Sequence, residues 1–200
     1  MAYERQDAAY RRAKREGYRS RAAYKLLELD AQFHLLKAGD RVVDLGSWPG
    51  AWLQVAAERV GPRGRVVGID LAAIDAMAPA NVRSLVGDVL DPETVARVRA
   101  ELGAPADVVL VDLAPKLTGV RATDSARQAE LVRSAIACAR AWLEPSGALL
   151  VKLFMDEEYP ALMRDLRAGF AEVRLRRPDA TRRGSRELYA LGRRPRPPSG

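Results

Sequence analysis

Residues 40–70, "DRVVDLGSWPGAWLQVAAERVGPRGRVVGID", decide the fold class. An apolar run at 41–45 ends in a glycine turn, a helical pattern follows and closes at Gly61, and a second apolar run ends at Asp70. The order strand, helix, strand is typical of a unit whose two strands are parallel. This stretch therefore predicts an α/β domain built on a parallel sheet.

The alternation continues along the rest of the sequence. Apolar runs predict strands at 82–88, 106–115, 147–154, 171–178 and 185–194. Helical patterns occupy 91–103, 124–147 and 157–170. Because the first five strands are almost continuously apolar, they are expected to lie in a sheet that helices cover on both faces. We predict a doubly wound, Rossmann-like domain.

Several helix ends can be predicted from capping residues. The segment "RSRAAYKLLELDAQFHLL" (19–36) is expected to form a helix that ends near Gly39, with His34 capping or packing its end. Asp91 and Pro92 fit an N-cap and the first position of a helix. Pro145 and Gly147 are expected to stop the long helix before the fifth strand.

Composition excludes several classes of protein. Hydrophobic residues make up 48% of the chain and charged residues 30%, which fits a globular protein with a core. No apolar run of about 18 residues and no secretory signal are seen, so we expect a cytosolic protein without a membrane span. Since Cys138 and His34 are the only residues of their kinds, no metal site is expected. A monomer is our working expectation.

Basic residues gather at the two ends of the chain. Residues 1–25 carry eight Lys or Arg against three Asp or Glu, and residues 174–200 carry nine against two. The whole chain has a net charge of +7, so the middle is acidic. Such ends favour a polyanionic partner, and the tyrosines among the N-terminal arginines could stack on bases of a nucleic acid. The alternative is that these ends are solvated tails. If they bind RNA, the phosphate contacts are expected from Arg11, Arg12, Arg15, Arg19 and Arg21.

Five ionisable residues stand at or just past the carboxyl ends of the predicted strands: Asp44, Asp70, Asp88, Asp112 and Lys152. In a doubly wound sheet these ends meet at one edge, where ligands bind. Asp70 is placed to accept both hydroxyls of a ribose, and Asp88 could accept from an adenine amino group. For each acid the alternative is an N-cap of the next helix.

The glycine loop narrows the choice of ligand. Gly46 and Gly50 allow a tight turn that brings backbone N–H groups near a ligand. The loop matches neither the dinucleotide fingerprint nor a P-loop, so an acidic pocket for a cationic adenosine derivative, S-adenosylmethionine, fits better.

Lys152 in "GALLVKLF" (147–154) stands near the end of a buried strand, where an unpaired ammonium is costly. Asp112 and Glu187 could hold it, and a lysine in such a site can act as a general base. By itself the pattern favours the alternative, a lysine that extends its ammonium to solvent.

Four of these residues together resemble a known family. Lys25 in "RSRAAYKLLEL", Asp112 in "DLAPKLTG", Lys152 in "LLVKLF" and Glu187 in "GSRELYALGRR" are similar to the Lys-Asp-Lys-Glu tetrad of the FtsJ/RrmJ (RlmE) family. Its members are RNA ribose 2′-O-methyltransferases that use S-adenosylmethionine. The resemblance covers the chain from about Tyr18 to Arg194.

The resemblance implies a fold, a substrate and roles for residues. The fold would be a seven-stranded, mostly parallel sheet with helices on both faces and an antiparallel last strand between the fifth and sixth. The substrate would be a uridine 2′-hydroxyl in the A-loop of large-subunit ribosomal RNA, with Lys152 as the base. The implied cofactor contacts are Asp44, Gly46, Pro49, Gly50, Trp52, Asp70, Asp88 and Asp112.

The implied organisation is a basic arm at 1–20, a methyltransferase domain at 21–194 and a flexible tail at 195–200. Two residues depart from the family's loop, which resembles "DLGAAPGGW": Trp48 replaces a small residue and Ala51 a glycine. Trp48 must therefore line the cofactor or point away from it. The alternatives are methylation of another RNA, a small-molecule methyltransferase, a non-catalytic RNA-binding module and, weakest, a dinucleotide oxidoreductase.

Overall fold

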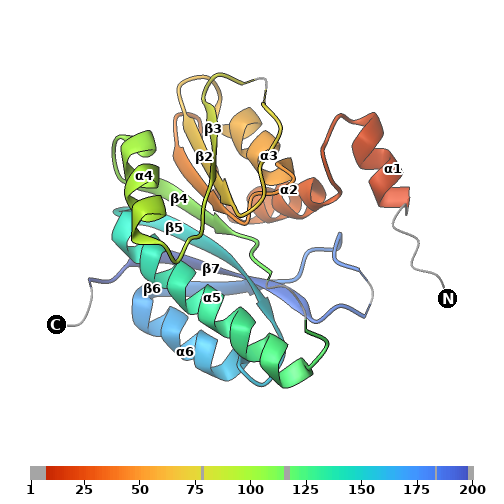
Figure 1. The fold of residues 1–200 in the computed structure, drawn as a ribbon, viewed down its shortest axis with the longest axis vertical. Coiled ribbons are helices and arrows are strands. Elements are labelled where there is room, and N and C mark those ends of the chain that lie inside the picture. The colour runs from red at the N-terminus through yellow and green to blue at the C-terminus, as the bar shows by residue number, and fades with distance from the viewer. Residues whose placement is uncertain (1–7, 78, 115–117, 183, 198–200) are drawn as a thin grey trace.

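The computed structural model describes residues 8–77, 79–114, 118–182 and 184–197. The start of the predicted arm (1–7) and the end of the predicted tail (198–200) lie outside the described residues. Within the described ranges, seven strands form one sheet (Figure 1): β1 (Arg41–Leu45), β2 (Arg65–Asp70), β3 (Val82–Val86), β4 (Ala106–Val111), β5 (Leu143–Phe154), β6 (Phe170–Arg176) and β7 (Glu187–Pro195).

The strands lie in the order β3-β2-β1-β4-β5-β7-β6. Strands β1 to β5 are parallel to one another, whereas β7 pairs antiparallel with both β5 and β6. The predicted sheet, including the insertion of the last strand between the fifth and sixth, is thus confirmed. The strand order runs outward from β1 in two directions, through β2 to β3 and through β4 to β5. The carboxyl ends of β1 and β4 therefore lie where the strand order reverses, which is the place where doubly wound sheets bind ligands.

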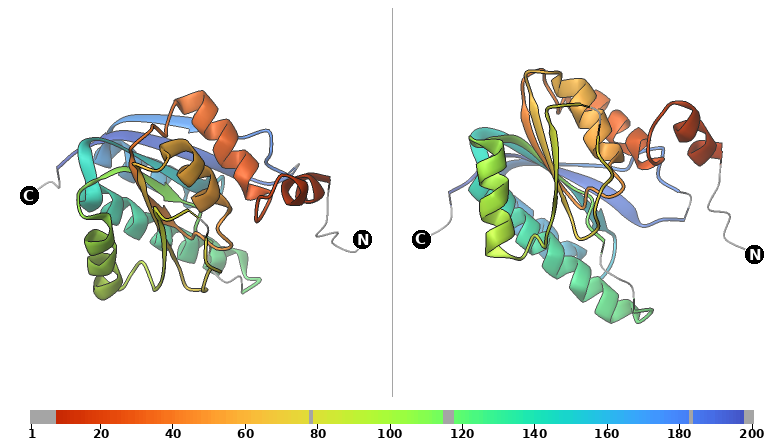
Figure 2. Two further views of the ribbon diagram at one scale, coloured as in Figure 1. Left: turned by 90° about the horizontal axis from the view of Figure 1, so that it is seen from above. Right: turned by 45° about the horizontal axis from the view of Figure 1, so that its top comes forward.

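Helices cover both faces of the sheet (Figures 1 and 2). One face carries α2 (Ala22–Phe33) and α3 (Ala51–Val60), and the other carries α4 (Pro92–Leu102), α5 (Arg121–Trp142) and α6 (Tyr159–Gly169). A shorter helix, α1 (Ala8–Arg15), lies beyond the N-terminal end of α2. Its Arg12 guanidinium stands 4.6 Å from the centre of the Tyr24 ring, and its neighbour Glu16 accepts the Tyr24 hydroxyl at 2.9 Å.

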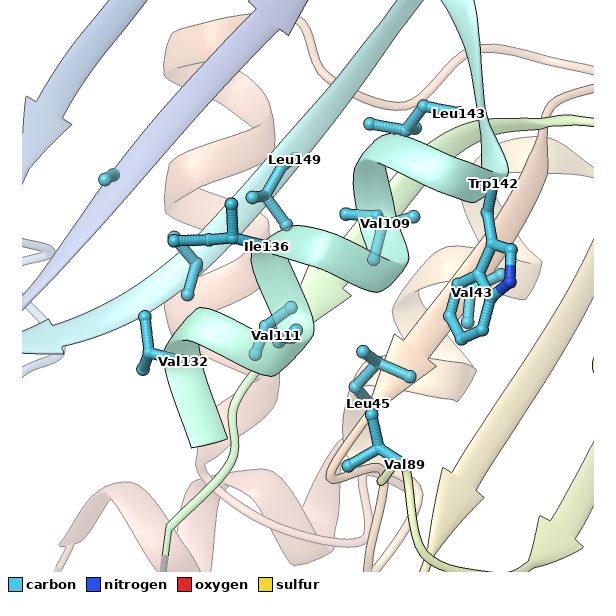
Figure 3. Close-up of a cluster of buried hydrophobic side chains, with 14 of the residues drawn as sticks. Val43, Leu45, Val89, Val109, Val111, Val132, Ile136, Trp142, Leu143 and Leu149 are labelled. Atoms are coloured by element: carbon cyan, nitrogen blue, oxygen red, sulfur yellow. The ribbon is translucent and has the colours of Figure 1, made fainter. Parts of the chain in front are cut away.

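Successive side chains of each strand point to opposite faces of the sheet, so the hydrophobic core forms two layers, one on each face. Figure 3 shows the layer under α5, where Val132 and Ile136 meet Val111 of β4 and Leu149 of β5. On the opposite face, Leu26 and Leu29 of α2 and the buried face of α3 cover the neighbouring residues of the same strands. Burial on both sides explains why the central strands read as continuous apolar runs.

The α2 helix ends earlier than its sequence indicates. It ends at Phe33, and His34 adopts the left-handed conformation (φ 48°) while donating its N–H to the Asp30 carbonyl. The Asp30 carboxylate then accepts the Leu36 N–H at 2.8 Å and pairs with Arg59 of α3 at 3.0 Å. The prediction of an end near Gly39 is therefore wrong, whereas His34 does cap the helix.

The boundary between α5 and β5 also differs from its prediction. Helix α5 begins at Arg121 and ends at Trp142, because Leu143 already pairs with Ala106 of β4. Pro145 falls in an irregular stretch of β5, where the register against β4 shifts between Ala106 and Val108. A proline is tolerated at such an irregularity because its missing N–H interrupts no regular ladder. Pro145 and Gly147 therefore do not end the helix, and the fifth strand begins four residues before Gly147.

Within the described ranges, no helix is long and apolar enough to cross a membrane.

Candidate active site

The loop between β1 and α3 is held close to the end of β4. Gly46 has φ 81°, and a side chain added there would meet backbone atoms of Asp112 and Leu113 at 3.1 Å. The N–H groups of Gly46 and Ser47 donate to the Ile69 carbonyl of β2. A residue with a Cβ would be strained at Gly46 by its φ and would have to push back the backbone of Asp112 and Leu113. The close approach shapes the floor of the site.

A cavity of about 350 Å³ opens at this edge of the sheet, within the size range of small-molecule sites. Four residues predicted as cofactor contacts line it: Gly46, Asp70, Asp88 and Asp112. Trp48 also lines it and is 60% exposed, and exposed Leu71 stands nearby in the same wall. Of the two positions expected for Trp48, the structure shows the first: the side chain lines the predicted cofactor site.

Asp70 is oriented by the backbone around it. One carboxylate oxygen accepts the Trp48 N–H at 2.9 Å, and the other accepts the Ala72 N–H at 2.9 Å. An ionised carboxylate offers about four acceptor positions, so two remain for hydroxyl donors. Asp88 is more exposed, and its carboxylate accepts the Leu90 N–H at 2.9 Å. Both acids follow strand ends without capping a helix, a role that Asp91 has instead.

Asp44 is the fully buried acid of the site. Among the described residues neither of its carboxylate oxygens has a hydrogen-bond partner. Burial raises the pKa of Asp44 well above its usual range, and the charges of Asp112 and Asp70 raise this pKa further. The acids that line the cavity, Asp70, Asp88 and Asp112, suit a cationic ligand, whereas the raised pKa of Asp44 favours its neutral form.

The four residues of the predicted tetrad form two ion pairs. The Lys152 ammonium lies 2.9 Å from Asp112 Oδ1 and also donates to the Asp112 backbone carbonyl at 3.1 Å. Lys25 of α2 pairs with Glu187 of β7. Since the Lys152 side chain is only 9% exposed, Asp112 provides the compensation that a buried ammonium needs.

Tyr189 joins the two pairs. Its hydroxyl lies 3.2 Å from Asp112 Oδ1 and 3.1 Å from Glu187 Oε1, and its ring is fully buried. Burial raises the pKa of Tyr189 well above its usual range, and both carboxylates raise this pKa further, so the hydroxyl keeps its proton and donates. Sequence reasoning missed Tyr189. A usable signal was its position two residues after Glu187, which puts both side chains on one face of β7.

Four residues predicted as cofactor contacts are not among those that line the cavity: Asp44, which is fully buried, and Pro49, Gly50 and Trp52. Trp52 is buried, its indole N–H donates to the Ala22 carbonyl at 2.9 Å, and its ring packs 5.7 Å from that of Tyr189. Gly50 is the N-cap of α3 with φ 104°, and its N–H donates to the Ser47 carbonyl. Pro49 accepts a bond from Arg19 through its carbonyl. In the structure Pro49, Gly50 and Trp52 support the loop and the tetrad.

The predicted RNA-binding arginines fall into two groups. Arg11, Arg12 and Arg15 are exposed on α1. Arg19 donates to the carbonyls of Pro49, Asp75 and Ala76, and Arg21 donates to the carbonyl of Ala180. The second group therefore ties the start of α2 to the rest of the domain. Contact with RNA stays a prediction for both groups.

No group of three or more His, Cys, Asp or Glu residues in the described part of the chain is arranged to hold a metal ion. The lone Cys138 is half-buried on α5, and burial raises the pKa of its thiol.

Comparisons with known proteins agree with this geometry. The family model of FtsJ-like methyltransferases matches residues 18–195. The chain is 44% identical over 194 residues to ribosomal RNA large subunit methyltransferase E of Syntrophobacter fumaroxidans, covering 97% of this chain and 98% of that protein. It is 42% identical to the protein of the same name from Methanothermobacter thermautotrophicus, over 96% of this chain and 92% of that one.

A solved structure has the same fold. A crystallised protein described as a ribosomal RNA methyltransferase from Plasmodium falciparum matches with a TM-score of 0.77 and 27% identity, over 88% of this chain and 98% of that one. The sheet order, the cavity at the strand ends and these matches define a Rossmann-like methyltransferase. Because the family model spans residues 18–195, the chain belongs to the FtsJ-like methyltransferase family.

The buried carboxyl of Asp44 gives a testable pH dependence. The folded protein binds this proton more tightly than the unfolded chain does, because the pKa of Asp44 is raised on folding. Its contribution to stability is therefore fully present at acidic pH and is lost as the pH rises toward the raised pKa. Asp44→Asn stays neutral, so the free energy of unfolding of this variant minus that of the wild type should increase from about pH 4 to neutrality.

Urea unfolding of both ligand-free proteins at several pH values measures this difference. Asp88→Asn is the matched control, since it removes an exposed carboxylate at the same edge of the sheet. A difference for Asp44→Asn that stays constant with pH would contradict the assignment.

Proposed function

We propose that the chain methylates the 2′-oxygen of a uridine ribose in large-subunit (23S) ribosomal RNA, with S-adenosylmethionine as the methyl donor. The main support is that the Lys152–Asp112 and Lys25–Glu187 ion pairs both contact the Tyr189 hydroxyl. Asp112 of the first pair also lines the predicted cofactor cavity. The names of the relatives support large-subunit ribosomal RNA as the substrate.

The acids at the strand ends fit S-adenosylmethionine. Asp70 would accept the two ribose hydroxyls with its remaining acceptor positions, and Asp88 would accept from the adenine amino group. The acids that line the cavity, Asp70, Asp88 and Asp112, suit a ligand that carries positive charge. When bound, S-adenosylmethionine supplies a sulfonium-activated methyl group and leaves as the neutral thioether.

The chain's own residues would deprotonate and position the hydroxyl. A hydroxyl is a weak nucleophile until its proton is removed, and Lys152, as the free amine, would take that proton on Nζ. Asp112 orients Lys152 through its carboxylate at 2.9 Å and its carbonyl at 3.1 Å. Lys25 and Glu187 would bind the ribose, and Tyr189 fixes Glu187 relative to Asp112. Positioning supplies a large share of the rate acceleration in such a site.

RNA contacts are proposed for the basic arm. On α1, Arg11, Arg12 and Arg15 are exposed and offer positive charge close to the start of α2, which carries Lys25. The division into an arm at 1–20, a methyltransferase domain at 21–194 and a tail at 195–200 belongs to this proposal. So do a monomeric state, a reaction that needs no metal and a cytoplasmic location.

Substitution of Lys152 tests the role of the general base. General-base catalysis contributes about 10²- to 10⁴-fold in rate, so Lys152→Ala should lower kcat at least about 100-fold. Methyl transfer from labelled S-adenosylmethionine to large ribosomal subunits that lack the modification measures this loss. Binding of S-adenosylhomocysteine, measured by calorimetry, should change less than about threefold, because Lys152 does not line the cavity.

Two further variants make the result interpretable. Lys152→Met fills the same space without an amine and should be as inactive as Lys152→Ala, whereas Lys37→Ala removes an exposed lysine and should keep full activity. Turnover by Lys152→Met within tenfold of the wild type would show that Lys152 is not the general base.

The arm is tested by the salt dependence of RNA binding. Replacing Arg11, Arg12 and Arg15 together by alanine should weaken binding of large-subunit ribosomal RNA and lower the slope of log K against log salt by about one unit per lost phosphate contact. Filter binding at several salt concentrations measures the slope. The control replaces three exposed arginines on the opposite face, Arg127, Arg164 and Arg167, with the same change in net charge. An unchanged slope in the α1 variant would contradict phosphate binding by these arginines and support the alternative that the arm is a solvated surface.

A further inference from the structure

The Lys25–Glu187 pair lines a second cavity and is absent from the lining of the cofactor cavity. The volume of the second cavity is about 540 Å³, and its walls include Ser20, Arg21, Lys25, Arg182, Ser185 and Glu187. The walls come from two segments far apart in sequence, the start of α2 and the described residues 177–182 and 184–186 between β6 and β7. The latter residues extend from the sheet toward the end of the molecule that carries α1 (Figures 1 and 2).

The side chains around this cavity favour an anion. Three of them are cationic, while the one carboxylate, Glu187, is already paired with Lys25 and accepts the Tyr189 hydroxyl. The two serine hydroxyls each accept a backbone N–H, Ser20 from Ala22 and Ser185 from Glu187, both at 3.2 Å. A hydroxyl in this arrangement can donate its own proton to a further acceptor. The cavity thus combines excess positive charge with neutral donors, the combination that binds phosphate groups.

Hydrogen bonds within the protein hold the described residues 177–182 and Ser185 in place. The Ala180 N–H donates to both carboxylate oxygens of Glu28 on α2, at 3.2 and 3.3 Å, and the Ala180 carbonyl accepts from Arg21 at 3.1 Å. Among these residues, the Arg182 carbonyl accepts the Ser185 N–H at 3.1 Å and an Arg177 guanidinium N–H at 3.4 Å. A site that is already organised avoids part of the entropic cost of binding.

We propose that this cavity binds a backbone phosphate of the RNA next to the target ribose, with Arg182, Arg21 and the two serines as its donors; the inference rests on the proposed function. The cavity and the tetrad share Lys25 and Glu187. In RNA the 3′-phosphate is attached to the carbon beside the one that carries the 2′-hydroxyl. A ribose whose 2′-hydroxyl faces Lys152 therefore carries a phosphate close to this pair. Holding that phosphate would fix the sugar in rotation as well as in position.

Arg182→Ala is the most direct test, because this side chain is exposed and its loss should not affect folding. With purified large ribosomal subunits as substrate, KM should rise about tenfold, the typical cost of one charged hydrogen bond, and the salt dependence of kcat/KM should flatten by about one unit of slope. The Kd for S-adenosylhomocysteine should stay unchanged. Arg182→Lys, which keeps the charge, should recover part of the lost affinity.

Arg186→Ala is the matched control, since Arg186 is an exposed arginine of the same segment that does not line the cavity. Its KM should stay within twofold of the wild type. A KM for Arg182→Ala equal to that of the wild type, or an equal rise in Arg186→Ala, would overturn the phosphate site. An absence of methyl transfer by the wild type would instead overturn the proposed function, so the two failures can be told apart.

Discussion

The Lys152 ammonium at the end of β5 sets the main constraint on this structure. A buried ammonium is tolerated only beside a carboxylate, and Asp112 supplies one at 2.9 Å from the end of the neighbouring strand. The antiparallel β7 lies on the other side of β5 and brings Tyr189 and Glu187 to the same edge. Lys25 of α2 then pairs with Glu187 above the sheet. The unusual position of the last strand is therefore what allows four charged residues from four elements to form one connected network.

The charges around this network are divided between two sides. Toward β1, β2 and β3 the site carries acids, of which Asp44 is fully buried and has a raised pKa. Toward α1 and the second cavity it carries arginines, among them Arg21 and Arg182. A cationic methyl donor and a polyanionic acceptor would thus approach the network from opposite sides, each toward charge of the opposite sign. This division explains why the protein has a net positive charge although the cavity at the strand ends is lined by acids.

Much of this arrangement could be predicted from the sequence, because it depends on local patterns. Continuous apolar runs identified the parallel strands, and the acids that follow them marked the edge where Gly46, Asp70 and Asp112 meet. The bridging role of Tyr189 could not be predicted in this way, since its partner Asp112 lies 77 residues away. The end of α2 at Phe33 also escaped prediction, because Asp30, which holds the following turn, is paired with Arg59 of another helix. The contact between Ala180 and Glu28 joins segments 152 residues apart and has no local signature.

We propose that the network of Lys25, Asp112, Lys152 and Glu187 directs methyl transfer to a ribose oxygen of large-subunit ribosomal RNA. This claim is tested most directly by the chemical identity of the product. Large ribosomal subunits from cells that lack the enzyme would be incubated with it and isotopically labelled S-adenosylmethionine, and the RNA digested to nucleosides for mass spectrometry. Label confined to the sugar of a 2′-O-methyluridine is the predicted result. Label on a base, or transfer to protein with none to RNA, would contradict it.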